Sequence, residues 1–146
     1  MLTVTMHDIY PRPSWNFVFG LANFSARTGV FSFKRYDPAF QDHHVTNRPL
    51  VLLKNSCHVM VHEIGHMYGI KHCIYYNCTM NGSNSYAEST RSTRYLCPLC
   101  LRKLSTAIGF KVSEWLSKMR TACAELGFVE DVQFYERLIA LGLEEK

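Results

Sequence analysis

A histidine and glutamate motif near the centre of the chain carries the residue types of a catalytic metal site. Residues 62–72 read H-E-I-G-H-M-Y-G-I-K-H. On an α-helix His62 and His66 lie four residues apart on one face, so they can bind one metal ion together. Glu63 flanks that face, where its carboxylate can reach a water molecule bound to the metal. The spacing therefore predicts a metal site with its own general base.

Two further residues extend this motif beyond the helix. Gly69 can adopt a positive φ angle without steric cost, so it can end the helix and turn the chain. The turn would bring His72 back as a third ligand, and three histidines leave one position of a tetrahedral zinc open for water, as in catalytic sites. The alternative is a histidine cluster that binds no metal. The added Gly69 and His72 make a chance match roughly a thousand-fold rarer.

Four cysteines follow in two closely spaced pairs. They are Cys73, Cys78, Cys97 and Cys100. Two such pairs joined by a loop can supply four thiolates to a closed, structural zinc site, and the alternative is two disulfides. No secretory signal is visible at the N-terminus, so we expect an intracellular, cytoplasmic or nuclear protein whose cysteines bind metal. Cys57 and Cys123 lie on apolar helical patterns and are expected to be buried free thiols.

The complete motif resembles that of the archaemetzincins, a branch of the metzincin metallopeptidases. The residues that carry the resemblance are His62, Glu63, His66, Gly69, His72, Cys73, Cys78, Met80, Cys97 and Cys100. The resemblance implies that His62, His66 and His72 bind a catalytic zinc. Glu63 would be the general base, and the four cysteines would bind a second, structural zinc. Met80 would form a packing floor beneath the catalytic metal, whereas without the resemblance it would be read as ordinary core.

The resemblance also implies an activity, that of a zinc metallopeptidase acting on peptides or small proteins. Zinc lowers the pKa of its bound water to about 7. Glu63 would take the proton during attack on the peptide carbonyl and pass it to the leaving amine. The alternative is a zinc-stabilised binding module without catalytic activity because of truncation. A nucleic-acid module built on the cysteines ranks last, because it leaves the histidines and Glu63 without a purpose.

The hydrophobic pattern predicts an α/β (α+β) fold, which the resemblance makes metzincin-like, with a small mixed sheet and an active-site helix. Runs rich in aromatic and β-branched residues predict strands over residues 2–6, 15–19 and 28–36. The charged end of the third strand indicates an edge strand, which could align an extended peptide by strand addition. A helical period over residues 50–68 predicts the helix that carries His62.

The second half of the chain is expected to form a zinc-bound loop followed by C-terminal helices. Residues 73–94 show no period and are predicted to be a loop. Apolar residues recur at every third or fourth position over residues 101–123 and again over residues 132–139. Gly127 is expected to break the chain between these two helices.

The length of the chain is typical of one domain. We expect a single metallopeptidase domain over residues 1–146. The sheet and active-site helix would occupy residues 1–72, and the structural zinc and helices residues 73–146. Archaemetzincins carry further strands and a helix before the segment that matches Leu2, so the resemblance implies a form that lacks the N-terminal part.

Composition narrows the expected partners. Of the 146 residues 47% are hydrophobic, and the formal net charge is +4. The basic residues are scattered and no apolar run could span a membrane, so we expect neither nucleic acid nor a membrane as a partner. His43 and His44 fall in a polar loop and are expected at the surface. His58 shares the metal-facing stripe and is either a helix-packing residue or a support for the ligands.

Overall fold

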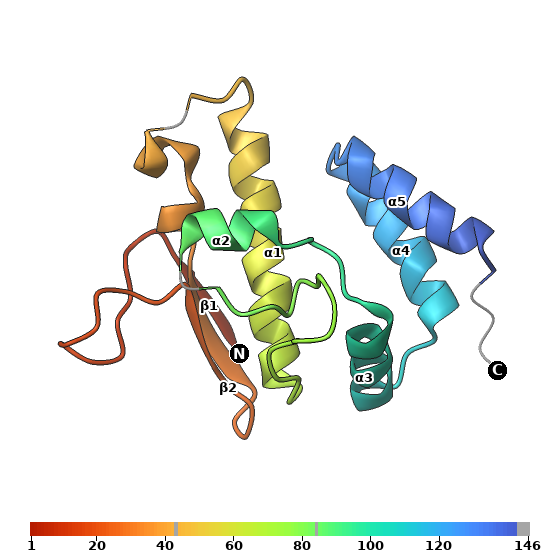
Figure 1. Ribbon diagram of the computed structural model, residues 1–146, viewed down its shortest axis with the longest axis horizontal. Helices are drawn as coiled ribbons and strands as arrows, with labels where there is room; N and C mark the ends of the chain where they lie inside the picture. Colours follow the sequence, from red (N-terminus) through yellow and green to blue (C-terminus); the bar gives the residue numbers. More distant parts are fainter. Residues whose placement is uncertain (43, 84, 143–146) are drawn as a thin grey trace. The chain divides into compact units, whose positions relative to one another are not determined.

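The computed structural model describes residues 1–42, 44–83 and 85–142 (Figure 1). The chain divides into two compact units, Met1–Cys100 and Leu101–Lys146. The first unit holds the sheet, the long helix and every residue of the histidine and cysteine motifs. The expected single metallopeptidase domain, with its division after residue 72, stays a prediction.

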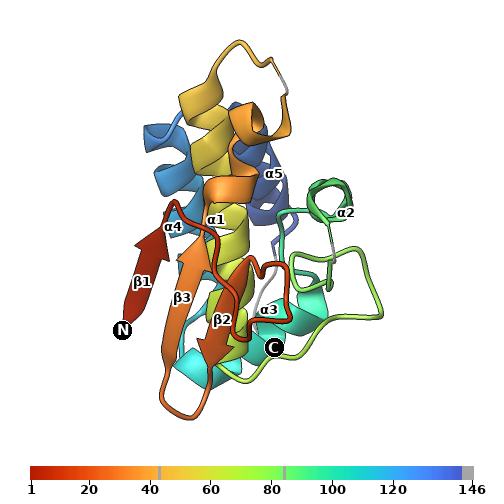
Figure 2. The same ribbon diagram turned by 90° about the vertical axis from the view of Figure 1, so that its left-hand side faces the viewer.

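The first unit contains a small mixed sheet, as expected. Its strands are β1 (Leu2–Thr5), β2 (Gly20–Asn23) and β3 (Thr28–Ser32), and they lie in the order β1-β3-β2 (Figure 2). β1 runs parallel to β3, whereas β2 is antiparallel to it. Phe31, the fourth residue of the central strand, is completely buried.

The prediction for the third strand is wrong in its place and its length. β3 is the central strand of the sheet and not an edge strand. It ends at Ser32 because the following residues, Lys34–Tyr36, turn into a 3₁₀-helix. The strand edges of this sheet are therefore offered by β1 and β2.

The strand expected over residues 15–19 is also wrong. These residues form one isolated bridge, between Ile9 and Val18, and regular pairing starts only at Gly20. The aromatic side chains pack as a cluster instead, with the ring of Phe19 centred 5.2 Å from Phe17 and 4.9 Å from Tyr36. Aromatic residues favour strands and ring clusters alike, so the composition of the run did not distinguish the two.

The loop that carries this aromatic run is clamped to the rest of the unit by Arg35. Its Nε donates a hydrogen bond to Oδ1 of Asp8 over 2.8 Å, and its guanidinium lies 3.6 Å from the ring centroid of Phe17. Lys34 pairs with the same carboxylate at 3.2 Å. The hydrogen bond from Arg35 is the main reason why the pKa of Asp8 lies below its usual value, although partial burial opposes it.

The helix α1 (Arg48–Met67) confirms the helical prediction for residues 50–68. Asn47 caps its start, because its Oδ1 accepts a hydrogen bond from the N–H of Leu50 over 3.2 Å. The helix packs across β2 and β3 (Figure 2), and Val59 and Met67 are buried. This packing places the last turns of α1, which carry the histidine motif, beside the sheet.

The segment between the two cysteine pairs is mostly loop, as expected, but it includes the short helix α2 (Tyr86–Arg91). The Ser85 side chain accepts a hydrogen bond from the N–H of Glu88 over 3.2 Å. This contact is half of an S-x-x-E capping box, which is a local signal for the start of a helix. The segment was predicted to be a loop because it shows no hydrophobic period. A 3₁₀-turn at Pro38–Gln41 likewise lies in a stretch read as polar loop.

The C-terminal region contains α3 (Pro98–Ile108), which crosses the boundary between the units, then α4 (Val112–Glu125) and α5 (Val129–Ala140). The single helix expected over residues 101–123 is wrong, because Gly109 adopts a φ of 84° and ends α3. Gly127, with a φ of 73°, separates α4 from α5 as predicted.

Within the second unit α4 and α5 pack against each other. Trp115 and Tyr135 meet edge to face with ring centroids 5.9 Å apart, and Arg120 pairs with Glu136 at 2.8 Å. Cys123 is buried, as expected. None of the helices in the described ranges is long and apolar enough to cross a membrane.

Candidate active site

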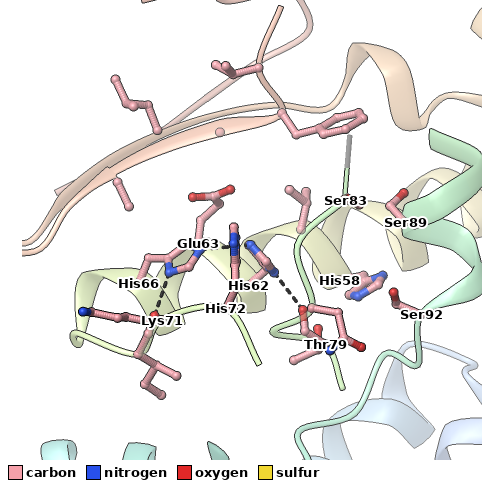
Figure 3. Close-up of a pocket in the computed structure, with 18 of the residues that line it drawn as sticks. His58, His62, Glu63, His66, Lys71, His72, Thr79, Ser83, Ser89 and Ser92 are labelled. Carbon is pink, nitrogen blue, oxygen red and sulfur yellow. Dashed lines mark hydrogen bonds between the residues drawn. The ribbon is translucent and has the colours of Figure 1, made fainter. Parts of the chain in front are cut away.

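The end of α1 brings the three histidines of the motif together. Gly69 adopts a φ of 80°, and the N–H of Ile70 bonds back to the carbonyl of Gly65 over 3.0 Å. The chain therefore reverses and returns His72 toward the helix (Figure 3). One ring nitrogen from each histidine, His62, His66 and His72, lies within 4.8 Å of the other two.

Two of these imidazoles are oriented by backbone carbonyls. Nδ1 of His62 donates to the carbonyl of Thr79 over 2.8 Å, and Nδ1 of His66 donates to that of Ile70 over 2.7 Å (Figure 3). A carbonyl can only accept, so each ring carries its proton on Nδ1 and keeps a lone pair on Nε2. Burial lowers the pKa of His62 to about 4 and also lowers that of His66, so burial favours the neutral form of both rings.

The resulting lone pairs converge. The Nε2 atoms of His62 and His66 are 3.0 Å apart, which is repulsive unless a cation lies between them. Two nitrogens bound to a tetrahedral zinc at 2.0–2.1 Å would lie roughly 3.4 Å apart. A ligating histidine usually donates its other N–H to a carbonyl, as both rings do here. The residues present therefore fit a zinc ion.

Glu63 lies beside this histidine set and against the sheet. It is 8% exposed, and burial raises its pKa to about 7. A Cβ atom placed on Gly20 would lie 2.7 Å from both Cγ and Cδ of Glu63. Gly20, the first residue of β2, can therefore lie this close to the Glu63 side chain only because it has no side chain of its own. The sequence reading missed Gly20, whose position directly after the aromatic run suggested only the end of a strand.

Two other glycines fit against site residues in the same way. A Cβ on Gly65 would lie 2.5 Å from Sδ of Met80, whose side chain is completely buried against α1. A Cβ on Gly82 would lie 2.9 Å from Nδ1 of His72. Met80 also accepts a hydrogen bond at its carbonyl from the N–H of Cys73 over 2.8 Å. The loop after α1 is thus folded closely around the returning histidine.

The four cysteines of the two pairs form a second cluster. Their Sγ atoms all lie within 4.8 Å of one another, and the residues are Cys73, Cys78, Cys97 and Cys100. All four are buried, and none forms a disulfide. Sγ of Cys73 lies 3.8 Å from Sγ of Cys97. Sulfur atoms on a tetrahedral zinc at 2.3 Å are also about 3.8 Å apart, so the cluster fits that ion.

Electrostatics favour a cation at this cluster. Burial raises the pKa of Cys78 and of Cys100. Burial also opposes ionisation of Cys73, but the N–H groups of Tyr75 and Tyr76 lower its pKa overall. Thiolates so placed need a positive charge to offset their desolvation.

Asn81 holds the loop of the first cysteine pair and was missed by sequence reading. Its Oδ1 accepts from the N–H of Cys78 over 2.8 Å, and its Nδ2 donates to the carbonyls of Cys73 and Tyr76 over 2.7 and 2.9 Å. The only sequence signal is an asparagine before a glycine, which is typical of many turns.

The histidine set opens into a cleft of about 810 Å³ in the first unit. Its walls come from residues 15–24, α1, the loop after α1 and the region of α2. His58 lines it one turn before the motif, and burial lowers its pKa to about 4. Of the two loop histidines, His44 is exposed as expected and His43 lies outside the described residues.

Comparisons with known proteins agree with this architecture. Residues 1–106 match the model of peptidase family M54. Archaemetzincin-2 of Rattus norvegicus is 41% identical over 76% of this chain, and the archaemetzincin of Thermococcus kodakarensis is 35% identical over 69%. The matched regions make up 37% and 53% of those two proteins.

Solved structures show the same fold. A zinc-dependent peptidase of Methanocorpusculum labreanum superposes with a TM-score of 0.60 at 30% identity, over 70% of this chain and 52% of that one. The archaemetzincin of Methanopyrus kandleri gives a TM-score of 0.59 at 31% identity, over 75% and 56%. The chain belongs to peptidase family M54, the archaemetzincins.

Proposed function

We propose that the chain is a zinc-dependent peptidase that hydrolyses peptide bonds in the cleft. The observation that carries the proposal is the convergence of two Nε2 lone pairs, from His62 and His66, next to the buried carboxylate of Glu63. Family membership supports it, although the chain spans only 37% of the length of the mammalian archaemetzincin-2 that it resembles.

A zinc ion held by His62, His66 and His72 would supply a Lewis acid and lower the pKa of a bound water. The carbonyls of Thr79 and Ile70 would keep the two helix imidazoles in the tautomer that binds metal. These contacts orient the ligands before any substrate arrives.

Glu63 would carry the proton. Its carboxylate accepts a proton from the attacking water, whose oxygen forms a bond to the carbonyl carbon of the substrate. It then donates that proton to the leaving nitrogen as the carbon–nitrogen bond breaks, so one water is consumed and a new carboxyl and a new amine are released. A pKa raised by burial toward neutrality suits a group that must both accept and donate.

The peptide would lie along β2. Gly20, Leu21 and Ala22 line the cleft, and β2 pairs with β3 on one side only within the described residues. A free strand edge can align an extended peptide by backbone hydrogen bonds. This assignment replaces the one based on residues 28–36, because β3 lies in the middle of the sheet.

The cysteine cluster would hold a second, structural zinc. It would fix the loop that returns His72, because Cys73 follows that histidine directly and is tied to the carbonyl of Met80. Retention of four metal-binding thiols also suits a reducing compartment, the cytoplasm or nucleus.

Metal analysis and peptide cleavage test the proposal together. The purified chain should contain two zinc ions and cleave a mixed peptide library. Glu63→Gln should keep both ions and lose at least about 100-fold in kcat, because proton transfer is removed. Glu130→Gln, an exposed glutamate of α5, is the matched control and should cleave like wild type.

Two outcomes would contradict the peptidase. Equal cleavage by wild type and Glu63→Gln would remove Glu63 from the reaction. A chain with two zinc ions that binds peptides and cleaves none would instead support the binding module.

A further inference from the structure

The loop between β1 and β2, residues 6–19, supplies one wall of the cleft (red in Figure 1). Its returning arm lines the cleft with three aromatic side chains, those of Trp15, Phe17 and Phe19. Residues 6–19 are all described and contain no helix or strand, and one isolated bridge joins the two arms. A loop of this kind has many accessible conformations, so the position of the wall depends on contacts from outside the loop.

Arg35 contacts both arms of this loop. On the outgoing arm, its Nε donates to Oδ1 of Asp8 over 2.8 Å and its Nη2 donates to Oδ2 over 3.2 Å, which makes a bidentate pair. On the returning arm, the same guanidinium lies 3.6 Å from the ring centroid of Phe17. The side chains of Arg35 and Asp8 are 25% and 20% exposed, so water screens their pair less than it screens a fully exposed one. One side chain therefore holds the loop from both sides.

The effect of Arg35 reaches the cleft through Phe17. Arg35 is not one of the residues that line the cleft, whereas Phe17 is. The ring of Phe17 meets that of Phe19 edge to face, with centroids 5.2 Å apart, and Phe19 in turn lies 4.9 Å from Tyr36. Arg35 thus lies behind the wall, and it supports rings that line the cleft.

We propose that Arg35 is a positioning residue for substrate binding, which holds the aromatic wall of the cleft in place through Phe17. A wall that is already ordered loses little conformational freedom when an apolar substrate side chain packs against it. The proposal rests on the proposed peptidase function, because it concerns the cleft in which the peptide would bind. Gly20, which contacts Glu63, is held by the pairing of β2 with β3. Arg35 should therefore act on affinity and not on the chemical step.

The neighbouring residue Lys34 provides a matched control. Its ammonium pairs with the same carboxylate, that of Asp8, at 3.2 Å, but it lies over the ring of Phe40 and not over that of Phe17. Lys34→Ala therefore removes a cation from Asp8 and leaves the returning arm in place. Arg35→Lys keeps the positive charge but loses the planar guanidinium that bonds through two donors and stacks on a ring. Together the two variants separate charge from geometry.

Peptide affinities of the zinc-loaded Glu63→Gln protein separate binding from turnover. The probes are a blocked hexa-alanine peptide and the same peptide with one phenylalanine at each position in turn. At one or more positions phenylalanine should raise the affinity about 10-fold, because the wall removes the ring from water. Adding Arg35→Ala should reduce this gain to about 2-fold or less and should not change the affinity of hexa-alanine.

The other two variants should differ from each other in the same assay. Arg35→Lys should lose most of the gain from phenylalanine, whereas Lys34→Ala should keep all of it. Two results would overturn the proposal. One is that phenylalanine raises the affinity at no position, and the other is that the gain persists in Arg35→Ala.

Proteolysis of the loop gives a readout that does not depend on peptides. Chymotrypsin cleaves after aromatic residues, and Trp15 is 50% exposed, but a folded loop must open locally before it is cut. Mass spectrometry should show that Arg35→Ala is cut within residues 15–19 at least about 10-fold faster than wild type, and Lys34→Ala at the wild-type rate. Equal rates in wild type and Arg35→Ala would show that Arg35 does not hold the loop. If Arg35→Ala unfolds as a whole, Arg35→Lys and Phe17→Leu decide the question in both assays, since each removes the stacking contact alone.

Kinetics distinguish this role from a purely structural one. With Glu63 intact, Arg35→Ala should raise KM for the best phenylalanine peptide about 5-fold or more and keep kcat within about 2-fold of wild type. A fall in kcat at constant KM would contradict the proposal. Failure of wild type to cleave any peptide would refute the peptidase, whereas the affinities and the proteolysis rates would still decide the role of Arg35.

Discussion

Three glycines let site residues lie against the backbone of neighbouring segments. Gly20 contacts Glu63, Gly65 contacts Met80, and Gly82 contacts His72. At each position an added methyl group would lie closer than ordinary van der Waals contact to its neighbour. The positions of Glu63, the proposed base, and of His72, a proposed ligand, therefore depend on residues that carry no functional group.

Gly20→Ala should impair catalysis and spare the metal. The new methyl group would displace the carboxylate of Glu63, and a displacement of about 1 Å can cost on the order of 100-fold in rate. We expect kcat to fall roughly 10- to 100-fold while zinc content stays that of wild type. The matched control is Gly29→Ala on β3, where the methyl would crowd Phe31 and Met67 instead. It should lower Tm and keep kcat, and equal kcat losses in both variants would contradict a specific role for Gly20.

Met80 is expected to act through packing. Its side chain is completely buried, so Met80→Ala leaves a cavity and should lower the free energy of unfolding by about 2–5 kcal/mol. Met80→Leu conserves volume and should cost less than about 1.5 kcal/mol. Urea unfolding of the zinc-loaded chain measures both. A Met80→Ala protein as stable as Met80→Leu would exclude a packing role against α1.

At the scale of elements, an ion pair joins the start of α1 to the 3₁₀-turn at Pro38–Gln41. Arg48 donates from Nε to Oδ1 of Asp37 over 2.7 Å, and from Nη2 to Oδ2 over 2.6 Å. The hydrogen bond from Arg48 is the main reason why the pKa of Asp37 lies below its usual value. Asp37 also accepts from the N–H of Ala39 over 3.0 Å, so one carboxylate caps the turn and anchors the helix.

This pair should make stability depend on pH. The folded pKa of Asp37 is lowered, so its contribution is fully present above the unfolded value of about 3.9 and is lost as pH falls through the folded pKa. Asp37→Asn should therefore be less stable than wild type at pH 7, and the difference should shrink below about pH 4. Chemical unfolding at pH 7, 5 and 3 measures this difference, from which effects common to both proteins, such as zinc release in acid, cancel. A difference that stays constant with pH would contradict the assignment.

The elements that could be predicted from sequence are those whose signals are local. The helix of the histidine motif follows from a 3.6-residue period ended by Gly69, and the cysteine cluster follows from two short spacings. The strand at residues 15–19 was misplaced because Phe17 and Phe19 satisfy their hydrophobicity in a ring cluster. The contacts of Gly20 and Asn81 could not be predicted, since they join segments that only the tertiary fold brings together.

For the whole molecule, the loop after α1 connects the two candidate metal sites. His72 and Cys73 are adjacent, and the N–H of Cys73 bonds to the carbonyl of Met80. The loop is closed again by Asn81, which bonds to both ends of the first cysteine pair. Loss of one ion should therefore disturb the ligands of the other.

Cys100→Ser tests this connection. The variant should lose the structural ion, and the remaining zinc should be removed by lower chelator concentrations than in wild type, because His72 is no longer held in place. Cys123→Ser, a buried cysteine of α4 outside the cluster, is the matched control and should keep two ions. Stepwise titration with a chelator, followed by zinc analysis, gives the number of ions bound and the chelator concentration that removes each of them. Unaltered retention of the second ion in Cys100→Ser would show that the sites are independent.

The carbonyl and the side chain of Thr79 differ in what they contribute to the site. Its carbonyl orients His62, and any amino acid provides a carbonyl. Its hydroxyl is buried and makes no hydrogen bond to any described residue. Position 79 can therefore change during evolution without loss of the contact that orients His62.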